Sequence, residues 1–175
     1  MNGDEPEVVA RAAAGDAGAF SLLVELHWAR LVRLARSVLG EADAEDAVQD
    51  GLVVAWERLP SLREPAAFRP WVTRLVTRTC LARARRSARR PGRAPLAAAA
   101  DVAHPAGGTD AGLDVARCLA ALAPRQRAVI HLTAVEGMSD SEIGRLLGIT
   151  PGSVRAHRRR ARRRLEHLWN GGPPE

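Results

Sequence analysis

The chain has 175 residues, a formal net charge of +6 and 26 basic residues, all of them arginine. This length suits one or two small domains, each with a modest core. No apolar run approaches the ~20 residues that span a bilayer, and neither the two cysteines nor the five histidines have metal-ligand spacing. We therefore expect a cytoplasmic protein without membrane insertion, bound metal or cofactor.

The charges are unevenly distributed along the chain. Residues Glu41–Asp50 include five acids and no base, whereas Arg74–Arg93 include eight arginines and no acid. A second basic segment, Ser153–Arg164, has seven arginines among its twelve residues. The arginine excess also fits a GC-rich coding sequence, so the count alone overstates nucleic-acid binding. The separation of one acidic and two basic segments predicts more than one macromolecular partner.

Helical periodicity dominates the first half of the chain. A weak helix is expected over 5–14, and apolar residues then recur at helical spacing over 17–39. No segment shows the sustained alternation that is typical of a strand. The sequence therefore predicts an all-α fold.

The acidic segment leads into an amphipathic helix that ends near residue 59. At about 100° per residue, Asp43, Asp46 and Asp50 share one side, and Gln49 lies at its border. Acids at a helix start also interact favourably with the helix dipole. Two interpretations stay open here: an ordinary surface helix, or an acidic docking face for a basic partner.

A proline-containing loop at 60–67 precedes a helix with a basic edge. Arg74, Arg78 and Arg85 fall along one side of this helix, next to an apolar face that includes Phe68 and Trp71. A tryptophan beside arginines can stack on an unpaired base while the arginines hold phosphates. A tryptophan at helical spacing is also typical of a core, so both roles remain open.

Composition divides the chain into two helical domains. Prolines, glycines and alanines replace the helical pattern after Ser87, which predicts a flexible linker over 89–112 between domains at 1–88 and 113–170. In the second domain, helices are expected over 113–123 and 125–135. Residues 171–175 are expected to be a frayed end.

The segment after residue 136 has the signals of a helix-turn-helix. Ser139 can cap a helix with Glu142 as its capping-box partner, and Gly148 can end that helix. Thr150 can cap the next helix, with Pro151 at its first position. The apolar positions of this second helix would dock on the domain and turn its arginines outward. Such a helix fits a DNA major groove, although an arginine-rich helix can also be merely solvated.

The order of these parts resembles the extracytoplasmic-function sigma factors of bacteria. The resemblance rests on Asp43–Asp50, Phe68–Trp71, the alanine-rich linker, Leu122–Val129 and Glu136–Ser139, and it covers about residues 7–169. It implies two helical domains, sigma-two and sigma-four, that bind core RNA polymerase and promoter DNA. It also implies an anti-sigma factor as a further partner, without any residue that identifies one.

The resemblance assigns residues to three interfaces. Contacts with the clamp helices of the polymerase β′ subunit would come from Asp43, Asp46, Gln49 and Asp50. The minus-ten element would be bound by the 60–67 loop and the basic helix, through Arg63, Phe68, Trp71, Arg74, Arg78 and Arg85. The minus-thirty-five element would be read by Ser153, Arg155, Ala156, Arg159, Arg160 and Arg163.

Some positions depart from the family pattern. Arg78 and Ala82 stand where relatives commonly have asparagine and aspartate, and Leu52 replaces the usual aromatic. The first two changes predict an unusual minus-ten preference.

The alternative function is a DNA-binding regulator of LuxR-like type, because Ser139–His157 also resembles that output domain. An enzyme is not expected, because no nucleophile, phosphate loop or metal set is apparent.

Overall fold

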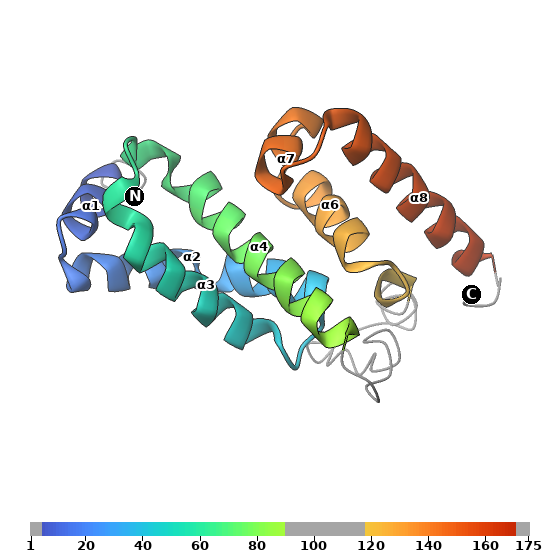
Figure 1. The fold of residues 1–175 in the computed structure, drawn as a ribbon, viewed down its shortest axis with the longest axis horizontal. Coiled ribbons are helices and arrows are strands. Elements are labelled where there is room, and N and C mark those ends of the chain that lie inside the picture. Colours follow the sequence, from blue (N-terminus) through green and yellow to red (C-terminus); the bar gives the residue numbers. More distant parts are fainter. Residues whose placement is uncertain (1–4, 90–117, 171–175) are drawn as a thin grey trace.

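A computed structural model describes residues 5–89 and 118–170, and every regular element in these two ranges is helical (Figure 1). This confirms the all-α prediction. The first module contains α1 (Glu5–Ala13), α2 (Ala17–Leu39), α3 (Ala44–Arg58) and α4 (Phe68–Ala88), with short 3-10 helices η1 (Leu59–Ser61) and η2 (Pro65–Ala67). The second module contains α6 (Pro124–Ala134), α7 (Asp140–Leu147) and α8 (Pro151–Trp169). Across the described ranges, no helix is long and apolar enough to cross a membrane.

Local signals explain where α2 begins and ends. The Asp16 carboxylate accepts a hydrogen bond of 2.9 Å from the Ala19 amide, which caps the helix. At the other end Gly40 has φ +86°, a backbone conformation that other residues rarely adopt. Apolar residues at helical spacing between these caps, among them Leu23, Leu31 and Leu34, are buried in the core of the first module.

Helices α3 and α4 approach each other closely at Gly51. A Cβ added at Gly51 would lie 2.9 Å from Val76 Cγ2, which is closer than real contacts allow, and 3.2 Å from Val76 Cα, which is tight. The missing side chain therefore brings the backbone of α3 against α4. Because of this approach, the acidic side of α3 and the side chains of α4 form parts of one surface.

The helix-turn-helix of the second module follows the sequence signals. Ser139 and Glu142 form the capping box of α7, and Gly148 ends it in the left-handed conformation with φ +67°. Thr150 caps α8 by accepting from the Ser153 amide at 3.1 Å, and Pro151 follows as its first residue. All of these predictions are confirmed.

The two modules pack directly against each other, which the sequence did not predict. Helix α6 lies against α2 and α4 (Figure 1), and Val129 and Leu132 of α6 belong to the same buried apolar cluster as Leu34 and Val38 of α2. The Arg127 guanidinium donates to the Val38 carbonyl at 2.7 Å. The expected linker, apart from Arg89, and the tail at 171–175 lie outside the described residues.

Candidate nucleic-acid and protein interfaces

The acidic side of α3 is open to solvent. Asp46 and Asp50 have side chains that are 66% and 57% exposed, and Gln49 is also exposed. Asp43 precedes the helix and is 18% exposed, without a side-chain hydrogen bond to the helix start. The opposite side of α3, including Val48 and Leu52, is buried. The carboxylates of Asp46 and Asp50 are therefore displayed outward by a helix whose other side is buried in the core.

Val53 belongs to the same surface and was missed by sequence reasoning. It is 59% exposed and follows Asp46 and Asp50 by seven and three residues, which places it on their side of α3. An exposed apolar side chain among acids is suited to anchor a partner, because it adds apolar burial to charge attraction. Its position on the acidic helical stripe was the signal available in the sequence.

Arg83 of α4 reaches across to these acids. Its NH1 lies 3.2 Å from Asp50 Oδ2, and its NH2 lies 3.1 Å from Asp46 Oδ2 and 3.5 Å from Asp43 Oδ1. Arg83 is 25% exposed. One guanidinium therefore bridges carboxylates from successive turns of the neighbouring helix.

The basic edge of α4 is exposed, but one predicted contact is buried. Arg74, Arg78 and Arg85 are all exposed, as is Arg63 in the loop before the helix. Phe68 is only 2% exposed and is among the largest fully enclosed side chains. This burial leaves almost no surface of Phe68 for the minus-ten contact that the resemblance implies. The buried ring of Phe68 anchors the first turn of α4 in the core.

Trp71 is half-buried and packs against the ring of Phe68. Its ring centroid lies 5.9 Å from that of Phe68, with the planes tilted by 39°. The neighbouring Arg69 NH2 lies 3.4 Å from Glu136 Oε2 of the second module. Trp71 thus has a packing role in the first module, while part of its surface remains at the edge of the arginine-bearing helix.

Helix α8 presents its arginines to solvent. Val154 and Ala161 are fully buried against the module, whereas Arg155, Arg159, Arg160 and Arg163 are exposed. Ser153 and Ala156, near the start of the helix, are half-exposed. The apolar side predicted from the sequence is therefore the docked side.

Asp140 at the start of α7 braces α8. Its two carboxylate oxygens accept from NH1 and NH2 of Arg158, the latter at 3.3 Å, and Asp140 Oδ2 lies 3.7 Å from Arg155 NH1. A bidentate pair of this kind fixes the angle between the two helices. Sequence reasoning missed Arg158 as a bracing residue, because its partner lies 18 positions earlier in the chain.

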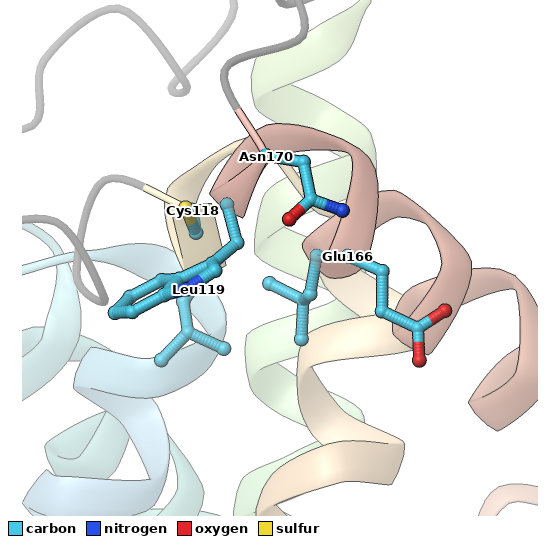
Figure 2. A pocket seen from close by; sticks show the side chains of 6 residues that line it. Cys118, Leu119, Glu166 and Asn170 are labelled. Carbon is cyan, nitrogen blue, oxygen red and sulfur yellow. The ribbon is translucent and has the colours of Figure 1, made fainter.

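An apolar hollow of about 320 Å³ lies at the C-terminal end of α8 (Figure 2). It is lined by Cys118, Leu119, Leu165, Glu166, Trp169 and Asn170. Glu166 pairs with Arg162 at 2.7 Å, and its carboxylate points away from Cys118 in Figure 2. Most of the lining of the hollow is apolar, from Leu119, Leu165 and Trp169. It offers a surface for apolar side chains.

Comparison with known proteins places both modules in one family. The model of Sigma-70 region 2 matches residues 23–90, and that of Sigma-70 region 4 matches residues 112–165. The ECF RNA polymerase sigma factor SigM of Mycobacterium tuberculosis is 36% identical over 165 residues, which cover 94% of this chain and 84% of that protein. The chain belongs to the extracytoplasmic-function (ECF) RNA polymerase sigma factors. This sigma factor therefore binds bacterial core RNA polymerase and directs promoter-specific transcription initiation.

Other relatives agree with this membership. The RNA polymerase sigma factor CnrH of Cupriavidus metallidurans is 35% identical over 184 residues, covering 96% of each chain. The structure of CnrH in complex with the cytosolic domain of CnrY has a TM-score of 0.67, covering 97% of this sigma factor and 99% of that chain. The sigma factor RpoE of Bartonella quintana, in complex with the anti-sigma factor NepR, has a TM-score of 0.69, with 25% identity over 86% of this chain and 96% of that chain.

Proposed function

We propose that this sigma factor docks on core polymerase through α3 and contacts promoter DNA through α4 and α8. The observation that supports this division is the display of opposite charges on separate helices. The carboxylates of Asp46 and Asp50 face solvent on α3, whereas the exposed arginines of α8 face solvent in the other module. Each helix is held by a buried apolar side. Each charged surface is therefore presented in a definite orientation.

The docking surface consists of Asp43, Asp46, Gln49, Asp50 and Val53. Its proposed partner is the clamp helices of the β′ subunit, which would supply basic side chains. Carboxylates that stay exposed attract such a partner from a distance and set its register. Gln49 adds a group that both donates and accepts hydrogen bonds. Val53 adds the apolar contact that charge attraction alone lacks.

The minus-thirty-five element is the proposed target of α8. Its N-terminal turns carry Ser153, Arg155, Ala156 and Arg159, in the part of a recognition helix that enters the major groove. Arg160 and Arg163 lie further along, where contacts with the phosphate backbone position the helix. The Asp140–Arg158 ion pair joins α7 to α8 and would hold α8 at its present angle to α7.

The minus-ten element is the proposed target of the loop and α4. Arg63, Arg74, Arg78 and Arg85 would hold phosphates of the melted strand, and the exposed part of Trp71 would stack on a base. Phe68 is buried and would support this surface from within. Arg78 replaces the asparagine common in the family, so we expect an altered base preference there.

The proposed action is binding alone, in the cytoplasm, without catalysis by this chain. CnrH and RpoE are related sigma factors whose structures were solved with CnrY and with the anti-sigma factor NepR. We therefore include an anti-sigma factor among the partners of this chain. The LuxR-like alternative is not favoured, because the Sigma-70 region 2 match at residues 23–90 gives the chain a second functional module.

Run-off transcription with purified core polymerase tests the proposal. Wild-type protein should yield promoter-dependent transcripts from genomic fragments, and Asp46→Arg should abolish stable co-purification with core. Arg155→Ala and Arg159→Ala should each weaken upstream-element binding by about 1–3 kcal/mol if these arginines touch bases. If they touch only phosphates, the loss should be equal on all sequences and the salt dependence shallower. Unchanged DNA binding by the double variant would refute the role of α8.

A further inference from the structure

Arg83 faces a different direction from the three arginines of α4 that the minus-ten proposal uses. At about 100° per residue it lies roughly 140–180° around the helix from Arg74, Arg78 and Arg85. Those three are exposed, whereas Arg83 is 25% exposed and turned toward α3. Arg83 therefore faces the acidic side of α3, on the opposite side of α4 from the edge formed by Arg74, Arg78 and Arg85.

The partners of Arg83 are three of the carboxylates assigned to polymerase docking. They lie at 3.1–3.5 Å from its two terminal nitrogens and come from positions 43, 46 and 50. Carboxylates spaced by one turn on a helix repel one another and favour rotamers that spread apart. The planar guanidinium can hold several of them at once, because its donors have fixed directions.

The ion pairs leave the docking surface accessible. Asp46 and Asp50 each engage Arg83 through Oδ2, yet their side chains remain 66% and 57% exposed. An incoming cation can therefore approach the outer side of each carboxylate while Arg83 holds the inner side. The close approach of α3 and α4 at Gly51 brings the two helices near enough for these ion pairs to form.

We propose that Arg83 is a positioning residue for polymerase binding: it holds Asp43, Asp46 and Asp50 in one cluster that matches the basic residues of the partner. This inference rests on the proposed docking role of α3. Arg83 acts through the three aspartates and makes no contact with the polymerase itself. Its removal leaves a more negative but less ordered surface. The two effects act on different rate constants.

Association and dissociation rates with immobilised core polymerase separate these effects. For Arg83→Ala we expect dissociation about fivefold faster, because the carboxylates are no longer held in register. Association should be unchanged or faster, because the surface gains one net negative charge. Arg83→Lys should give an intermediate dissociation rate, since one ammonium cannot hold three carboxylates. Arg86→Ala removes the same charge from an exposed position of α4 and should leave dissociation unchanged.

A double-mutant cycle distinguishes positioning from a general structural effect. In an Asp46→Ala/Asp50→Ala background, Arg83→Ala should change the dissociation rate by less than about twofold, because two of its three partners are gone and only Asp43, at 3.5 Å, remains. A general loss of structure would instead add to the effect of the aspartate substitutions. Circular dichroism checks folding, and Arg83→Gln replaces Arg83→Ala throughout if the alanine variant loses helicity.

Three outcomes would overturn one proposal or the other. Slower dissociation of Arg83→Ala would mean that Arg83 competes with the polymerase for the acids, and unchanged dissociation would mean that it positions nothing. Either result, with binding weakened but still measurable in the aspartate double variant, refutes only the role of Arg83. If the aspartate double variant binds core as tightly as wild type, the docking role of α3 falls as well.

Discussion

Substitution of Glu136 is the most direct test of the contact between the two modules, because Glu136 pairs with arginines of the first module. Its Oε2 lies 2.9 Å from Arg30 NH1 of α2 and 3.4 Å from Arg69 NH2 of α4. The Glu136 side chain is 5% exposed and that of Arg30 is 13% exposed, whereas Arg69 is 58% exposed. Glu136→Gln removes the negative charge but keeps the size of the side chain. It leaves the buried Arg30 charge without the carboxylate that it pairs with directly.

The expected magnitude follows from this burial. Breaking a buried ion pair by removing one partner costs about 3–5 kcal/mol. Arg30 NH1 keeps a hydrogen bond of 2.9 Å to Thr73 Oγ1, and the guanidinium retains a small exposed fraction, which both reduce the loss. We therefore expect the modules to separate about 2 kcal/mol more easily, close to a 30-fold change in the equilibrium constant. Arg69→Ala should cost below about 0.5 kcal/mol, because its ion pair is exposed.

Energy transfer between dyes on the two modules measures this separation. Cysteines at Glu57 of α3 and His167 of α8, both exposed, carry the dyes in a Cys118→Ser background. The native Cys80 should stay unlabelled, because burial raises the pKa of its thiol to about 12 and thiolate is scarce. Transfer is followed as urea is added. Glu136→Gln should lose transfer at a clearly lower urea concentration than wild type or Arg69→Ala.

An apolar replacement separates charge pairing from packing. Arg30→Met with Glu136→Leu removes both charges and should bring the urea midpoint close to that of wild type, because no buried charge is left unpaired. The reasoning would be refuted if Glu136→Gln and wild type had the same midpoint. It would also be refuted if the exposed partner Arg69 proved as important as the buried partner.

Three further predictions concern folding. Gly51→Ala should lower the free energy of unfolding by about 1–3 kcal/mol in urea titrations, because its Cβ would lie 2.9 Å from Val76 Cγ2; unchanged stability would show that α3 and α4 can move apart freely. Ser139→Ala should cost about 1 kcal/mol through loss of the α7 cap, whereas the same change at exposed Ser141 should cost less. Burial lowers the pKa of His131, as do the charges of Arg33 and Arg30, against the opposing effect of Glu136. The unfolded chain therefore binds the proton more readily, so stability should fall as pH drops below about 6.5 and level off above it. His131→Gln should make stability depend less on pH. A similar contribution from His27 should remain, because burial also lowers the pKa of His27. An unchanged pH profile would contradict the assignment to His131.

The helix boundaries and the helix-turn-helix were predictable from the sequence alone. Ser139 with Glu142, Gly148, and Thr150 with Pro151 each act on backbone groups within four positions of themselves. Such signals are complete in a short stretch of chain, so no knowledge of the rest is needed. The acidic side of α3 and the outward arginines of α8 were predictable for a similar reason, because helical spacing places them opposite apolar residues.

Tertiary packing alone decided the remaining features. Periodicity put Phe68 beside Trp71, but only the neighbouring helices determine that Phe68 is 2% exposed. In the sequence, Arg83 is not distinguishable from the other arginines of α4. Its acidic partners on α3 lie 33 to 40 positions earlier, and only the packing of the two helices brings them together. Arg30 and Glu136 are 106 positions apart, and no local pattern pairs them. Contacts of this kind depend on how whole helices stack, and that arrangement is set by the summed burial of many apolar side chains rather than by any one stretch of sequence.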